Sequence, residues 1–155
     1  MLNSFIEWAR ENNWNIVINP EKINLPDSIK NRYNIPEQWF NFICNFSICE
    51  NQSSTKWFLT LNDYSTITEF FQWNEFELQS LEFAANENEK EQIISYWNTH
   101  LPIILSIDGE YSYYAIDTEN GSVVSAYEPE YEESTIIADD FHTFIENVIS
   151  GKILL

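Results

Sequence analysis

The C-terminal third of this chain constrains its fold more than any other feature. Residues 101–107 form an almost uninterrupted apolar run, with Pro102 near the start, where a strand tolerates the missing amide donor. Asp108-Gly109 is a turn signal typical of β-hairpins, and a second turn is expected at residues 117–121. The pattern therefore predicts three antiparallel strands, at residues 101–107, 111–116 and 122–127.

Helical spacing of apolar residues occurs at both ends of the chain. Leu2, Phe5, Ile6 and Ala9 follow the i, i+3, i+4, i+7 spacing of an amphipathic helix. At the other end, Asp139 or Asp140 is expected to cap a last helix that ends near Gly151. Three more helices are predicted: one after Asn34-Ile35-Pro36, one after Ser65-Thr66, with Glu69 at capping-box spacing, and one over residues 87–98. Extended segments are predicted at residues 14–24, with a turn at Asn19-Pro20, and at residues 57–61.

The apolar face of the helix after Asn34-Ile35-Pro36 is expected to include Phe46, whereas residues 74–86 fit no single state. Strands in the last third with helices on either side predict an α+β fold, an antiparallel sheet flanked by helices. The length of 155 residues fits a single domain, residues 1–155, and 6 Trp, 8 Tyr and 11 Phe can supply its core. We expect a monomer.

The charge of the chain limits its partners. It has 25 acidic residues against 7 Lys and Arg, a net charge of -18. Binding to nucleic acid needs cations that replace the counterions of phosphate, so nucleic acid and anionic membranes are not expected partners. Between Glu91 and Gly151 there is no Lys or Arg at all. Such a field steers a basic protein toward the chain, although charge that serves only solubility is the alternative.

The segment Tyr127–Glu133 is the strongest candidate for partner contact. It combines four carboxylates, two tyrosines and a proline without a cation, and tyrosine is enriched in protein interfaces. A solvated acidic loop is the alternative interpretation. The predicted contact residues are Tyr127, Glu128, Glu130, Tyr131, Glu132 and Glu133, followed by Asp139 and Asp140.

Residue patterns of catalysis or metal binding are missing from the sequence. With 3 glycines the chain has no phosphate-binding loop, and it has no Gly-x-Ser-x-Gly nucleophile motif. His100 and His142 are interpreted as satisfied or solvent-facing histidines. Cys44 and Cys49 are interpreted as free thiols rather than zinc ligands, and residues 117–121 as a plain turn rather than a calcium loop. We therefore expect no enzyme activity, no cofactor and no metal.

The N-terminus and the apolar runs bear on location. Glu7 falls where a signal peptide would have its apolar region. No apolar run approaches the roughly 18 residues of a membrane-spanning helix. The expected location is the cytoplasm.

Several motifs together resemble the SUKH superfamily, whose founding members include a fungal cell-wall-synthesis regulator. They are Leu101-Pro102-Ile103, Asp108-Gly109, Tyr113–Asp117, Gly121-Ser-Val-Val, the closing segment Ile137–Ile145, the helix entry Ile35-Pro36-Glu37 with Trp39, and Trp57-Phe58-Leu59. The similarity covers residues from about 25 to 150. Where the family usually has an Asn-Gly pair, this chain has Cys44–Cys49, so that loop is expected to differ.

The resemblance implies a SUKH-like fold and a protein-binding role. In bacteria such domains typically act as immunity proteins that neutralise polymorphic toxins, often nucleases, and nuclease domains tend to be basic. The leading hypothesis is therefore an immunity protein that binds a toxin nuclease domain through an acidic surface. The alternatives are a regulatory or scaffold domain of the cell-wall-regulator type and a hydrolase that uses an unrecognised carboxylate pair.

Overall fold

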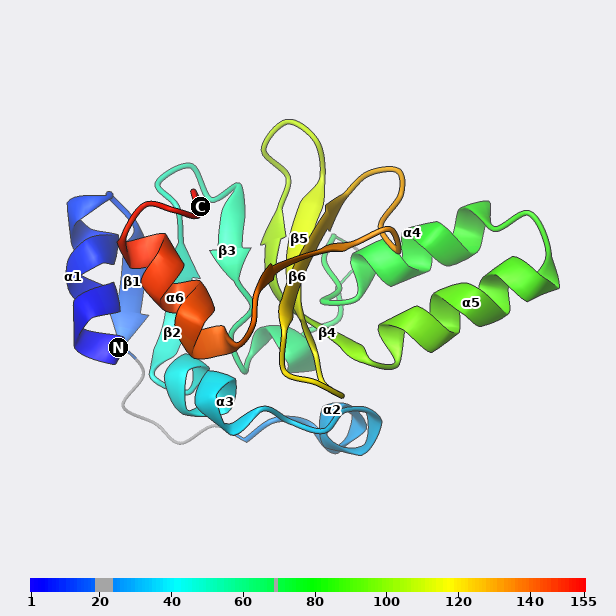
Figure 1. The fold of residues 1–155 in the computed structure, drawn as a ribbon, viewed down its shortest axis with the longest axis horizontal. Helices are drawn as coiled ribbons and strands as arrows, with labels where there is room; N and C mark the ends of the chain where they lie inside the picture. Colours follow the sequence, from blue (N-terminus) through cyan, green and yellow to red (C-terminus); the bar gives the residue numbers. More distant parts are fainter. Residues whose placement is uncertain (19–23, 69) are drawn as a thin grey trace.

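A computed structural model describes residues 1–18, 24–68 and 70–155 of the chain (Figure 1). The helices in these ranges are α1 (Leu2–Glu11), α2 (Asp27–Arg32), α3 (Glu37–Ile43), η1 (a 3-10 helix, Asp63–Ser65), α4 (Glu75–Phe83), α5 (Glu87–Trp97) and α6 (Phe141–Ile149). The strands are β1 (Asn15–Ile18), β2 (Phe46–Glu50), β3 (Lys56–Phe58), β4 (His100–Ser106), β5 (Ser112–Asp117), β6 (Val123–Tyr127) and β7 (Thr135–Ala138).

The strands form one antiparallel sheet in which each strand pairs with the next one along the chain. The order is β1-β2-β3-β4-β5-β6-β7. Helices flank this sheet, so the predicted α+β fold with an antiparallel sheet is confirmed. The three strands predicted in the last third correspond to β4, β5 and β6 within one residue at each end.

Helices cover both faces of the middle of the sheet. On β5, the ring of Tyr114 lies 5.4 Å from Phe144 of α6, whereas the neighbouring Tyr113 points the other way and lies 4.9 Å from Trp97 of α5. The central strand β4 is buried along residues 101–106. This two-sided burial explains why its sequence is continuously apolar rather than alternating.

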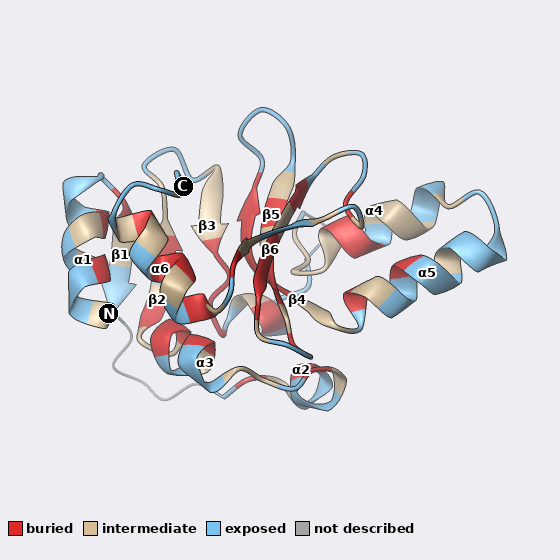
Figure 2. Cartoon of the chain, in the orientation of Figure 1, coloured by how far each residue is buried: buried red, intermediate tan, exposed pale blue. Residues whose placement is uncertain are grey.

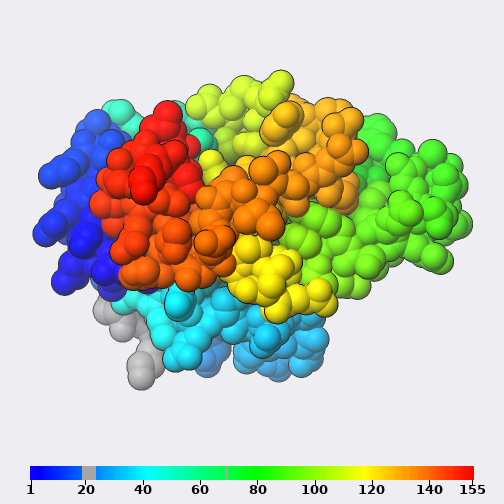
Figure 3. Space-filling model, in the orientation of Figure 1, coloured from blue at the N-terminus to red at the C-terminus, as the bar shows by residue number. Residues whose placement is uncertain are grey.

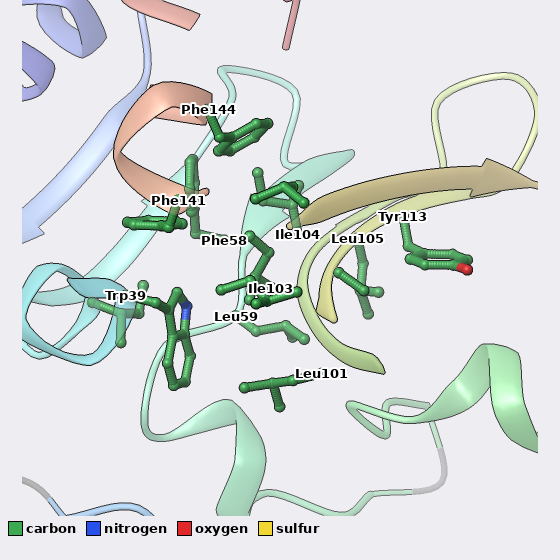
Figure 4. Packing of buried hydrophobic residues seen from close by; sticks show 14 of the residues in the cluster. Trp39, Phe58, Leu59, Leu101, Ile103, Ile104, Leu105, Tyr113, Phe141 and Phe144 are labelled. Atoms are coloured by element: carbon green, nitrogen blue, oxygen red, sulfur yellow. The ribbon is translucent and has the colours of Figure 1, made fainter. Parts of the chain in front are cut away.

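One face of the sheet packs against α1, α3 and α6 through aromatic side chains. Phe42 of α3 lies 4.9 Å from Phe5 of α1 and 5.3 Å from Phe141 of α6. Figure 4 shows Phe58, Phe141 and Phe144 gathered beside the aliphatic residues of β4. Each fully buried Phe contributes roughly 1.5–3 kcal/mol by leaving water, so this aromatic layer is a large part of the folding energy.

Helices α4 and α5 form a hairpin that projects from the other end of the sheet (Figure 1). Its base is packed, whereas its far end is mostly exposed (Figure 2). The base is joined to α2 by an ion pair. Two guanidinium nitrogens of Arg32 donate to the two carboxylate oxygens of Glu77 at 2.9 and 2.6 Å, and the guanidinium also lies over the ring of Trp73 at 5.8 Å.

The predicted helix after Ser65-Thr66 is wrong. The hydroxyl of Thr66 donates to the carbonyl of Asn62 at 2.9 Å and closes the 3-10 turn, so it does not cap a helix that follows. Ile67 and Phe70, which should have formed the apolar face, are 73% and 96% exposed. Glu69, the other half of the predicted capping box, lies outside the described residues.

The bounds of three strands also differ from the predicted ones. Phe46 belongs to β2 and not to the preceding helix, because it pairs with Ile18 of β1. The strand predicted at 57–61 is shorter than expected, and the segment predicted at 14–24 is a strand only over Asn15–Ile18. The turn predicted at Asn19-Pro20 lies outside the described residues.

The cap of α6 gives a first prediction. The carboxylate of Asp140 accepts the amide of Thr143 at 2.7 Å, and this bond lowers the pKa of Asp140. We expect Asp140→Ala to lower the free energy of unfolding by about 1 kcal/mol at neutral pH, measured by urea denaturation. Because the folded-state pKa is depressed, the loss should be complete above the unfolded pKa and shrink as pH falls through the folded pKa. Asp140→Asn, which keeps a cap, is the control, and an equal loss in both variants would contradict the assignment.

The ion pair at the hairpin base gives a second prediction. Arg32→Met leaves the carboxylate of Glu77, whose side chain is only 8% exposed, buried without a partner. We expect a loss of about 3 kcal/mol in urea denaturation, part of which the second change Glu77→Met should restore. Lys30→Met, which breaks the exposed pair with Asp27 in the same helix, should change stability by about 0.5 kcal/mol or less. Equal losses in the two single variants would show that the pair is not buried as described.

Candidate functional site

Residues 128–134, the acidic segment, connect β6 to β7 and lie against the α4–α5 hairpin. Tyr131 anchors the segment, because its side chain is only 3% exposed and its ring stacks on Phe76 of α4 at 4.6 Å and 9°. Its hydroxyl donates to Oε1 of Gln79 at 3.2 Å. The hydroxyl of Tyr113 donates to the main-chain carbonyl of Tyr131 at 2.5 Å.

Two glutamates of the acidic segment are also held by bonds within the chain. Oε1 of Glu132 accepts the indole N–H of Trp97 at 2.6 Å. Oε1 of Glu128 accepts the amide of Tyr111 at 3.0 Å, and the amide of Glu128 donates to the carbonyl of Tyr111 at 2.8 Å. These contacts hold the acidic segment in place within the chain.

The hydroxyl network beneath the segment has a defined direction. Burial raises the pKa of the Tyr113 and Tyr131 hydroxyls, so both stay protonated donors at neutral pH. The single hydrogen of Tyr113 goes to the carbonyl of Tyr131. The hydroxyl of Tyr96, 2.7 Å away from that of Tyr113, must therefore be the donor in their bond.

A hollow of about 500 Å³, the acidic groove, opens between the acidic segment and the hairpin. Its apolar part consists of Phe83, Ile93 and Pro129, and Phe83 is 82% exposed. None of the described residues that line it is a Lys or Arg. A concave surface with charge of one sign concentrates the field and attracts counter-ions or cationic side chains. The carboxylates that line the groove are Glu89, Glu128, Glu130, Glu132 and Glu133.

The structure divides the predicted contact residues into three groups. Tyr127, 63% exposed, and the exposed Glu130 and Glu133 are free to meet a partner. Tyr131 is wrong as a surface contact, because its ring fills the space beneath α4. The half-buried Glu128 and Glu132 line the groove but also bond within the chain. Asp139 is exposed and Asp140 caps α6, and neither lines the groove.

Sequence reasoning missed the half of the groove that the hairpin supplies. Phe83, Glu89 and Gln92 line it from α4 and α5. A signal was available, because residues 82–91 contain four glutamates. That signal needs a secondary structure for residues 74–86, because the α4–α5 hairpin is what places Glu89 beside the acidic segment.

The residues considered for catalysis or metal binding have contacts of a structural kind. Nδ1 of His100 lies 2.8 Å from the carbonyl of Tyr96, and Nε2 of His142 lies 3.1 Å from Oε1 of Glu146. Burial raises the pKa of the Cys49 thiol, which disfavours the thiolate. In residues 1–18, 24–68 and 70–155 no group of three or more His, Cys, Asp or Glu is placed to hold a metal ion.

Comparisons of the chain with protein-family models, with curated proteins and with solved structures found no match. No helix in the described part of the chain has both the length and the apolar character needed to cross a membrane. The acidic groove, with its geometry and charge, and the sequence resemblance to the SUKH superfamily are therefore the features that bear on function.

The anchoring of the acidic segment can be tested through Tyr113. Tyr113→Phe removes the hydroxyl that donates to the carbonyl of Tyr131 while keeping the ring. We expect a stability loss of about 1 kcal/mol and faster amide hydrogen exchange in residues 128–134, measured by NMR. Tyr114→Phe on the opposite face of β5 is the control and should leave exchange in that segment unchanged. Unaltered exchange in the Tyr113 variant would show that the segment is held by other contacts.

Proposed function

We propose that this chain is a non-catalytic immunity protein of the SUKH type, which binds and neutralises a basic toxin domain through the acidic groove. The expected class of toxin is a nuclease, because a nuclease active site is built to attract phosphate and is correspondingly cationic. A partner surface of that kind complements the groove. Binding there places carboxylates where the nuclease would hold the phosphates of its substrate.

The observation that carries the proposal is the combination of charge and fixed geometry at the groove. Five carboxylates surround the hollow, and four of them belong to the acidic segment. Tyr131 stacks this segment on Phe76, Tyr113 donates to its main chain, and Trp97 donates to the side chain of Glu132. Because the segment is ordered before binding, little entropy of ordering opposes association. The exposed ring of Phe83 adds an apolar contact of the kind that dominates binding energy in interfaces.

Glu130→Lys combined with Glu133→Lys tests the groove. Both side chains are exposed, so the fold should tolerate the change. The measurement is growth of cells that co-express each variant with a basic toxin nuclease domain against which the unaltered chain protects, followed by stopped-flow association of the purified pair. We expect loss of protection, and association at least about tenfold slower with a weaker dependence on salt.

Glu7→Lys combined with Glu11→Lys is the matched control, because it changes the net charge equally on the exposed face of α1. It should retain protection and alter association by less than about threefold. Equal effects of the two double variants would show that net charge acts and not the groove. Binding without protection would favour a regulatory or scaffold role, and the absence of both would refute the proposal.

A further inference from the structure

The last strand of the sheet has one edge that pairs with no strand of the described residues. β7 pairs with β6 and ends the strand order. Alternate N–H and C=O groups of an antiparallel edge strand point away from the sheet. Among the described residues, no main-chain bond beyond the pairing with β6 involves Thr135–Ala138. In Figure 3, this part of the chain runs in orange across the middle of the face shown, and no other segment covers it.

The composition of this edge differs from that of a protected edge strand. Natural edges are protected by shortness, by bulges, or by charged residues and Pro within the strand. β7 is short and its pairing has a register shift, but residues 134–138 read Ser-Thr-Ile-Ile-Ala and contain neither a charge nor a Pro. Ile136 is 62% exposed, and β-branched residues of this kind favour strand pairing. The register of β7 on β6 shifts between Ile136 and Ala138, so an added strand would pair most regularly with the residues before that shift.

Two acids stand at each end of this uncharged stretch. Glu132-Glu133 precede it and Asp139-Asp140 follow it. If two copies of the chain paired antiparallel through β7, the glutamates of each copy would face the aspartates of the other. In a parallel pairing, like residues would face each other. Like charges directly opposite across strands are destabilising, so the flanking acids oppose self-association.

We propose that the free edge of β7 accepts an extended segment of the partner protein, with apolar residues at its centre and Lys or Arg at both ends, as an eighth strand of the sheet. Main-chain hydrogen bonds supply affinity in this mode of recognition, and the flanking charges supply specificity. The edge is continuous with the acidic segment, because residues 128–134 lead directly into Thr135. The identification of the partner as a toxin rests on the proposed function, whereas the chemistry of the segment rests on β7 alone.

Three synthetic peptides provide the test. The first is Lys-Lys-Ser-Thr-Ile-Ile-Ala-Lys-Lys. The second has the chain's own Glu-Glu and Asp-Asp ends in place of the lysines, and the third is the Lys-flanked peptide with Pro in place of the first Ile. All three should be capped at both ends and titrated into the ¹⁵N-labelled protein, with amide exchange followed by NMR. We expect the first peptide to bind at least about tenfold more tightly than the other two and to slow exchange in residues 134–137. The Pro peptide keeps the charge but cannot form a regular strand.

A charge-reversed protein extends the test. Glu133→Lys combined with Asp139→Lys should reverse the preference, so that the peptide with acidic ends binds more tightly than the Lys-flanked one. Equal binding of the Lys-flanked and Pro peptides, protection confined to the residues of the acidic groove, or no protection at all would overturn the inference. These peptides contain no toxin, so their result is independent of the growth assay. If the chain fails to protect cells from the toxin, the edge inference still stands. If the peptides fail to bind, the groove proposal still stands.

Discussion

The hydroxyl of Tyr113 is the point on which the candidate site depends. The side chain is completely buried in the middle of β5, and its oxygen meets both Tyr96 of α5 and the carbonyl of Tyr131. It therefore connects the sheet, the helical hairpin and the acidic segment through one atom. A buried polar atom that lost these partners would be left without compensation, which typically costs about 1–3 kcal/mol. The position of the acidic segment thus depends on contacts with core residues. The groove that the segment lines therefore depends on the packing of the sheet.

The charge of the chain sets a second constraint, because self-repulsion opposes compaction at a net charge of -18. The structure offsets this repulsion with apolar burial on both faces of the sheet. It also places one of the few cations, Arg32, in an ion pair with the buried Glu77. Most of the other carboxylates in the described residues are exposed, where solvent screens them. At the groove they are brought close together without cations, and this arrangement raises the repulsion that a cationic partner would relieve. The same logic applies at β7, where the flanking acids oppose self-pairing but would favour a strand with basic ends.

The sequence predicts the elements whose signals are local. The hairpins of the last third, the cap of α6 and the helix α5 follow from spacing, turn residues and a capping side chain within a few positions of one another. Helix α4 could not be found in this way, because it buries the charged side chain of Glu77 against Arg32, 45 positions earlier in the chain. The burial of Tyr131 could not be predicted for the same reason. A tyrosine among glutamates is typical of an interface, and only the fold shows that its ring stacks on Phe76. Half of the groove therefore depended on one long-range ion pair and one aromatic stack, neither of which leaves a periodic pattern.

A fixed acidic segment between two possible contact surfaces has a consequence for how binding energy is distributed. In the proposed complex, the groove would attract cationic side chains at a distance and would act chiefly on the rate of encounter. The edge of β7 would act only at contact, through main-chain bonds that must break before release, and would act chiefly on the rate of dissociation. Because residues 128–134 join the two surfaces without a flexible link, a partner that engages one is held near the other, and the second contact forms at high effective concentration. The proposed immunity role requires both fast capture and slow release of a toxin, and the acidic segment places the two proposed contact surfaces side by side.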